Sequence, residues 1–96
     1  MIVSQLTNAQ GKAVKNQFVI INGDITTFQS YDGQIVDIDR KNKIIMFYPN
    51  YNYSNTTSKY CCKFLSDTLD ANIKSKDIDK MISDSVYNDY KVNLIK

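Results

Sequence analysis

Two turn signals inside a run of alternating side chains constrain the fold of this chain more than any other feature. Asn22-Gly23 separates an apolar, β-branched run at 17–22 from an alternating segment at 25–30, and Asp32-Gly33 follows at once. Asn-Gly is the preferred central pair of a type I′ hairpin turn, because both central residues need a positive φ. We therefore predict a β-hairpin here, with a second turn at Asp32-Gly33.

Two further strands are expected at 34–39 and 43–48, joined by the polar link RKNK. Alternation puts Val36 and Ile38 on one face of the first strand and the intervening carboxylates on the other. Connections this short cannot make parallel crossovers, so the four strands should form an antiparallel meander.

The second half of the chain is predicted to be mainly helical. Pro49 ends the fourth strand, and a helix should begin near Ser54 to Thr57, since Ser, Asn and Thr are favourable N-caps. A second helix is expected from Ser75, as its cap, to about Ser85, and a last strand at 90–95. The apolar stripe of the first helix comprises Tyr60, Cys61, Phe64, Leu65, Thr68 and Leu69.

These elements predict an α+β fold in the order β-β-β-β-α-α-β. An antiparallel sheet of about four to five strands would be covered on one face by the two helices. The length of 96 residues suits a single domain, 1–96. Residues 1–15 are ambiguous and would form either an edge strand or an ordered arm.

Composition limits the classes of function. The net charge of +2 is too small to indicate nucleic-acid binding by bulk electrostatics. No apolar run approaches the roughly 18 residues of a membrane span, and the N-terminal segment does not resemble a signal peptide. We expect a cytoplasmic protein with no membrane association. Cys61 and Cys62 are adjacent, which disfavours a disulfide between them, and are expected to be free thiols.

Catalytic and metal chemistry find little support. The chain has no His, so a thiol nucleophile lacks its usual base, and adjacent cysteines on a helix diverge too far to bind one zinc easily. Cys61 is expected to be a small core residue and Cys62 a half-exposed one. Asp37, Asp39 and Lys43 suggest a Mg²⁺-dependent nuclease, but further ligands are lacking, and charges there are more typical of a solvated strand face. We expect no enzyme, metal or cofactor.

The segment at 51–63 leaves three interpretations open. Its candidate partner-binding residues are Tyr51, Tyr53, Asn55, Lys59 and Lys63. The tyrosines could cover the end of a small core, contribute to a protein interface, or stack on single-stranded nucleic acid beside the lysines.

Two sequence blocks resemble an uncharacterised family of small proteins from bacteriophages and mobile elements of Gram-positive bacteria. The resemblance spans about residues 25–95. Tyr51 replaces a Trp of the family pattern, and the chain carries a longer N-terminal stretch. The matching residues are Phe28, Gln29, Ser30 and Tyr31 in the first block, and Tyr51, Tyr53, Ser54, Thr56, Thr57, Lys59, Tyr60, Phe64 and Leu65 in the second.

The resemblance implies a phage or plasmid origin and no particular enzymatic activity. Small proteins of such origin often bind host proteins, so we expect a non-enzymatic inhibitor that blocks a host defence complex, in particular a CRISPR effector (an anti-CRISPR). The alternative is a phage accessory protein that binds single-stranded nucleic acid through its tyrosines and lysines. Monomer and homodimer both fit the sequence.

Overall fold

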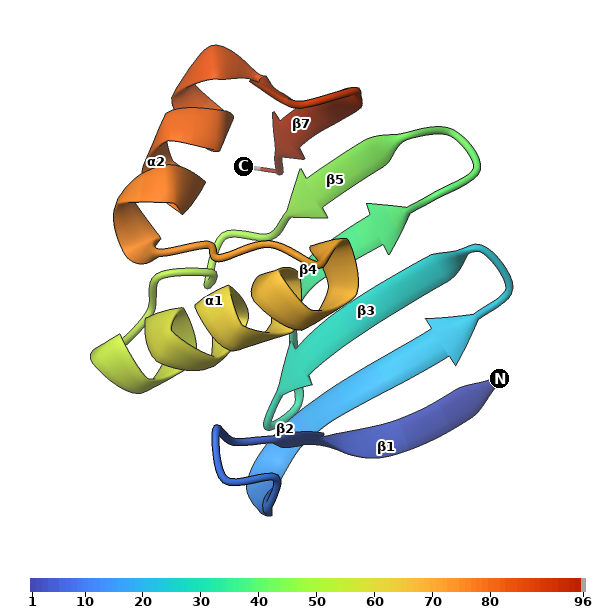
Figure 1. Cartoon of the computed structure of the whole chain (residues 1–96), viewed down its shortest axis with the longest axis vertical. Helices are drawn as coiled ribbons and strands as arrows, with labels where there is room; N and C mark the ends of the chain where they lie inside the picture. The colour runs from blue at the N-terminus through green and yellow to red at the C-terminus, as the bar shows by residue number, and fades with distance from the viewer. Residues whose placement is uncertain (96) are drawn as a thin grey trace.

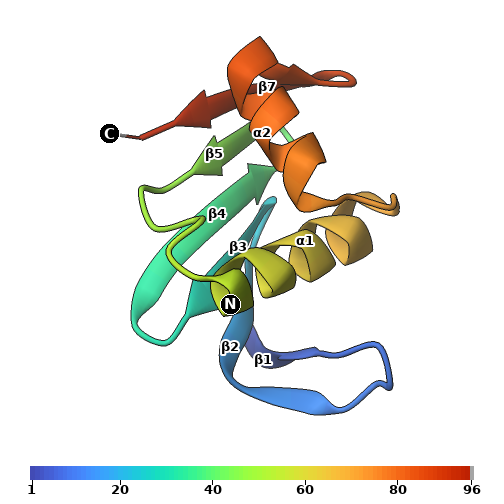
Figure 2. The same ribbon diagram turned by 90° about the vertical axis from the view of Figure 1, so that its left-hand side faces the viewer.

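One mixed sheet carries both helices on the same face (Figure 1; Figure 2). The computed structural model describes residues 1–95. The spatial strand order is β1-β2-β3-β4-β5-β7-β6. The elements are β1 (Ile2–Thr7), β2 (Ala13–Asn22), β3 (Ile25–Ser30), β4 (Gly33–Asp39), β5 (Ile44–Phe47), α1 (Asn55–Leu69), α2 (Ser75–Asp84), β6 (Val86–Tyr87) and β7 (Tyr90–Leu94).

The predicted meander is confirmed over β2 to β5, which pair antiparallel in sequence order. Phe28 pairs with Val36, and Val36 with Phe47, so these three apolar side chains line up across neighbouring strands on the helix-covered face. All three are fully buried. The carboxylate of Asp37 lies on the opposite, uncovered face, as alternation requires.

Both hairpin turns lie one residue away from their predicted positions. The first joins Asn22 to Ile25 through Gly23 and Asp24, and of these central residues only Gly23 has a positive φ. Positive φ at the first central position alone is the pattern of a type II′ turn, so the predicted type I′ turn is wrong. The second hairpin turns through Tyr31 and Asp32, because Gly33 already pairs with Ser30.

The ambiguous N-terminal segment contains an edge strand. β1 pairs antiparallel with β2 from Ile2 to Gln5 in regular register, and the register then shifts before Thr7. The extra residues of β2 opposite this shift include Asn16, whose φ is 65°. Leu6 reaches the core from β1 and is 3% exposed.

The sheet has seven strands and is mixed, so the prediction of four to five antiparallel strands is wrong in detail. β7 pairs parallel with β5, because α1 and α2 carry the chain back before it re-enters the sheet. The two-residue strand β6 then pairs antiparallel with β7 at the far edge. The α+β class and the two helices on one face are confirmed.

The helix caps follow one prediction and depart from another. Ser54 is the N-cap of α1, and its Oγ accepts a hydrogen bond from the backbone N–H of Thr57 at 3.1 Å. At α2 the N-cap position is Lys74, and not Ser75. The Asp77 carboxylate accepts the Lys74 backbone N–H at 2.9 Å, which places negative charge in the first turn.

One hydrophobic core lies between the sheet and the helices. Phe64 of α1 stacks on Phe28 of β3 with ring centroids 5.5 Å apart. Neither helix of the described chain combines the length and apolar character needed to cross a membrane. The buried apolar residues are Leu6, Phe28, Ile35, Val36, Ile38, Ile45, Phe47, Cys61, Phe64, Leu65, Ile73, Ile78, Met81 and Val92.

Candidate functional site: a tyrosine groove

A groove of about 470 Å³ lies between the β3–β4 turn and the start of α1. We call it the tyrosine groove, because it is lined by the two most exposed tyrosines, Tyr31 at 62% and Tyr53 at 75%. Tyr31 comes from the turn, and Tyr53 from the loop that leads into the helix. The lining residues are Ser30, Tyr31, Asp32, Gly33, Ile35, Asn50, Tyr53, Ser54 and Thr57.

Tyr31 has a backbone conformation that is unusual for an aromatic residue. Its φ is 57°, at the first central position of the turn, where glycine is the normal residue. Two hydrogen bonds hold this conformation: the Tyr31 N–H donates to the Asn16 carbonyl at 2.6 Å, and Gln29 Nε2 donates to the Tyr31 carbonyl at 2.8 Å. The irregular part of β2 that contains Asn16 therefore fixes the backbone position from which the Tyr31 ring projects.

The opposite wall is built by the loop between β5 and α1. The Tyr48 N–H donates to the Ile35 carbonyl at 2.9 Å, which ties the beginning of this loop to β4. The Tyr53 N–H donates to the Asn50 carbonyl at 3.1 Å, which forms the turn before Ser54 caps the helix. The Tyr53 ring is thus exposed on an ordered backbone turn.

The floor of the groove is partly polar. Ser30 is 7% exposed and Thr57 is 8% exposed. Gln17 pairs with Ser30 across β2 and β3 and is 2% exposed, and its Oε1 has no hydrogen-bond partner among residues 1–95. A buried acceptor without a partner is uncommon and costs folding free energy.

The groove has little positive charge in its walls. Asp32 is a lining residue, whereas Lys and Arg are absent from the lining that residues 1–95 provide. The first turn of α1, which lies wholly within the described chain, contributes no acidic residue of its own to offset the positive end of the helix dipole. The groove therefore combines aromatic walls, small hydroxyl side chains and a single carboxylate.

The five residues that the sequence predicted as a binding surface do not lie together in the structure. Tyr53 lines the groove, and Asn55 opens α1 directly beside it. Tyr51 instead packs edge-on against Phe47 with ring centroids 5.5 Å apart, and contributes to a separate small hollow beside α2. Burial, then the nearby Asp79 carboxylate, raises the pKa of Tyr51.

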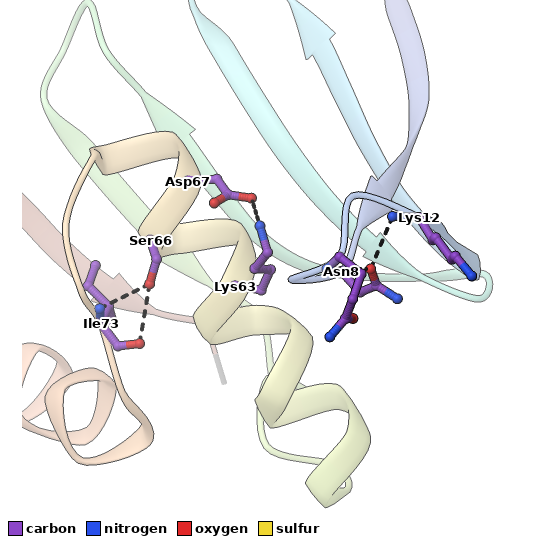
Figure 3. A network of polar contacts seen from close by, with 7 residues as sticks. Asn8, Lys12, Lys63, Ser66, Asp67 and Ile73 are labelled. Carbon is purple, nitrogen blue, oxygen red and sulfur yellow. Dashed lines mark hydrogen bonds and ion pairs between the residues drawn. The ribbon is translucent and has the colours of Figure 1, made fainter.

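The two lysines of the set lie further along α1 and outside the groove lining. Lys59 is exposed, with its Nζ 5.5 Å from the centroid of the Tyr60 ring. Lys63 forms an ion pair with Asp67 at 2.5 Å, one turn further along the helix (Figure 3). An exposed i,i+4 pair contributes little to stability, but it leaves Lys63 partly neutralised.

Sequence reasoning did not include Tyr31 in the binding surface. A turn predicted at Asp32-Gly33 leaves Tyr31 before the turn, whereas the observed turn runs through Tyr31 and Asp32. The signal that could have found it is a tyrosine directly after a predicted strand and before Asp-Gly, where a two-residue turn would force it to the tip.

The carboxylate of Asp37 accepts hydrogen bonds from three neighbouring side chains. It accepts hydrogen bonds from Thr27 Oγ1 at 2.5 Å, from Gln34 Nε2 at 2.8 Å and from the Tyr48 hydroxyl at 2.7 Å. Burial, followed by the hydrogen bond and charge of Asp37, raises the pKa of Tyr48 to about 12.

The carboxylate of Asp39 is hydrogen-bonded to the turn that follows it, between β4 and β5. Its oxygens accept from the side chain and backbone of Asn42 and the backbone of Lys41. The Asn42 side-chain bond is the largest cause of a lowered pKa at Asp39. No cluster of three His, Cys, Asp or Glu side chains suited to a metal occurs within residues 1–95, so the geometry adds no support to the nuclease hypothesis.

The cysteines have the environments that the sequence predicted. Cys61 is fully buried, and this burial raises the pKa of its thiol well above the usual range. Cys62 is half-buried, with its Sγ 3.7 Å from Ser75 Oγ. The contact of Cys62 is therefore with a hydroxyl group, and that of Cys61 is with the apolar core.

Comparison with known proteins gives a family without an assigned activity. A family of unknown function (DUF8033) matches residues 1–80, which is more than half of the chain. The chain belongs to this family. The match includes the N-terminal strands β1 and β2, which lie outside the resemblance described from the sequence over about residues 25–95. No curated protein and no solved structure matched the chain.

Proposed function

We propose that this protein is a non-enzymatic binding protein that binds a protein partner through the tyrosine groove. The observation that carries the proposal is the pair of exposed tyrosines, Tyr31 and Tyr53, on ordered backbone at the two sides of one groove. Tyrosine offers a large contact area with few rotatable bonds, and it is enriched at binding surfaces. The strained backbone at Tyr31 adds support, because such strain concentrates at functional positions.

The charge around the groove favours a protein partner over nucleic acid. A surface for single strands combines aromatic rings with cations that follow the backbone phosphates. Here the lining contributed by residues 1–95 includes Asp32 but no cation, and Lys63 is paired with Asp67. Nucleic-acid binding is therefore the weaker proposal.

We further propose a host defence complex, in particular a CRISPR effector, as the partner. This narrower proposal rests on the resemblance of the two sequence blocks to small phage proteins. It concerns the class of partner only. The groove proposal stands independently of it, since it depends on Tyr31 and Tyr53 alone.

The proposal is tested by a plasmid-interference assay in bacteria that carry active CRISPR systems. Expression of the wild-type chain should restore plasmid transformation, and Tyr53→Ala should abolish most of this effect. Val86→Ala removes an exposed apolar side chain far along the chain from the groove and should behave as wild type. Unchanged interference with the wild type, together with no co-purifying host protein, would refute the proposal.

Binding of single-stranded DNA or RNA should be measured alongside. The alternative function predicts affinity that falls steeply with salt and weakens with Lys59→Ala, because phosphate contacts release counterions. The proposed function predicts no such binding.

A further inference from the structure

The two edges of the sheet differ in how they are protected against pairing with another strand. At one edge β6 has only two residues, and a positive-φ residue, Asn88, turns the chain directly after it. Very short edge strands are a common way to prevent edge-to-edge association. The other edge is the six-residue strand β1, which pairs with β2 on one side only.

β1 lacks the usual protective features along its regular portion. Residues 2–7 read IVSQLT and contain no charged residue and no proline. Ile2 is 63% exposed and Val3 is 59% exposed. These two side chains lie on opposite faces of the sheet, so β1 has exposed apolar surface on both faces. Figure 1 shows that α1 crosses the sheet away from β1 and leaves this edge uncovered.

A groove of about 430 Å³ runs beside this edge on the helix face. Its walls come from Ser4 to Thr7 of β1 and from the flank of α1 that carries Phe64 and Asp67. A strand added to β1 would place alternate side chains next to those of Ile2 and Ser4, beside this groove. The edge therefore offers backbone hydrogen-bonding groups together with adjacent space for side chains.

We propose that β1 pairs antiparallel with β1 of a second copy, to form a two-fold symmetric dimer with a continuous sheet. β1 carries no charged side chain, so pairing it with its own copy puts no like charges opposite each other. Each copy has one long open edge and one short edge, so the assembly closes at two chains and does not extend into a fibre. The surface is distinct from the tyrosine groove.

The proposal is tested by sedimentation velocity of the full chain across the micromolar to millimolar range. The wild type should sediment as a dimer, at twice the chain mass of 11.0 kDa, at the upper concentrations. Val3→Lys places a charge within the regular portion of the edge and should give a monomer at the same concentrations. Val86→Lys makes the same change on the exposed surface of β6 and should leave the dimer intact.

Far-UV circular dichroism checks that each variant is folded, and Ile2→Lys provides a second disruption of the same edge. Hydrogen exchange on the wild type gives a readout without substitution, since the amides of β1 should become more protected as the concentration rises. A wild type that is monomeric throughout would overturn the proposal and leave the edge free for a strand of another protein. A dimer that persists in both Val3→Lys and Ile2→Lys, or a larger assembly, would also overturn it.

Discussion

Tyr31 occupies a position at which a two-residue hairpin turn normally carries glycine. Its φ of 57° costs a bulky L-residue about 1–2 kcal/mol relative to ordinary backbone. Asn tolerates this region better, and the ring of Tyr31 is mostly exposed, so little packing is lost on its removal. We expect Tyr31→Asn to raise the free energy of unfolding by about 1 kcal/mol while weakening partner binding.

Urea denaturation monitored by circular dichroism measures this effect. Tyr53→Asn is the matched control, because Tyr53 is exposed but has no positive φ. It should change the free energy of unfolding by less than about 0.5 kcal/mol. A destabilising Tyr31→Asn would show that the ring contributes to folding and would remove the argument from strain.

The two adjacent cysteines should differ sharply in reactivity. Cys61 is buried and its pKa is raised, whereas Cys62 is half-buried. Thiolate is the reactive form, so a disulfide reagent at mildly alkaline pH should label Cys62 in the native protein and Cys61 only after unfolding. Mass spectrometry of the labelled peptide after a time course identifies the site. Rapid native labelling of Cys61 would contradict the packing of α1 on the sheet.

At the scale of elements, the start of α1 depends on one side chain. Ser54 Oγ accepts the Thr57 N–H, and the loop that carries Tyr53 ends at this cap. Ser54→Ala should lower the free energy of unfolding by about 1 kcal/mol, the usual loss for an N-cap. Thr56→Ala, in the first turn but outside the cap, should be neutral or slightly stabilising, because Ala has the higher helix propensity. Equal effects of the two changes would argue against the cap.

Tyr48, which directly follows β5, donates a hydrogen bond from its hydroxyl to Asp37 of β4. This contact should make the free energy of unfolding fall at alkaline pH. The pKa of Tyr48 is about 12 in the folded chain, against about 10 for an unperturbed tyrosine. Because folding raises this pKa, the corresponding stability is complete below about pH 10 and is lost as the pH rises toward 12. Tyr48→Phe should remove this part of the alkaline loss when urea midpoints are compared from pH 8 to 12. Identical pH profiles would contradict the burial of the Tyr48 hydroxyl and its hydrogen bond to Asp37.

Periodicity predicted the elements whose two faces differ in burial. Val36 and Ile38 are buried, and Asp37 faces outward between them, because a one-residue slip would put carboxylates into the core. The apolar stripe of α1 was predictable for the same reason, and Cys61, Phe64 and Leu65 are buried. Periodicity did not predict whether residues 1–15 form an edge strand or an arm, because β1 is exposed along most of its length.

Features that depend on distant contacts were not predictable. The parallel pairing of β5 with β7 depends on how two helices return the chain, and no local pattern encodes it. The two-residue strand β6 is too short to have a period. The tyrosine groove joins Tyr31 to Tyr53 across 22 positions of sequence, so its existence follows from the packing of α1 on the sheet.

At the scale of the whole molecule, the tyrosine groove and the open sheet edge are two separate surfaces. The groove lies where the β3–β4 turn meets the start of α1, and the edge lies at β1. The central claim is that the groove is the surface that holds a protein partner. It is independent of the oligomeric state.

Quantitative capture from host lysate tests the central claim most directly. The wild-type chain, the double variant Tyr31→Asn with Tyr53→Asn, and the control Thr56→Ala are immobilised equally, and the bound proteins are compared by mass spectrometry after nuclease treatment. We expect components of one defence complex to be enriched by the wild type and the control, and to fall to background with the double variant. Equal capture of those components by the double variant, or no enrichment by the wild type, would contradict the central claim.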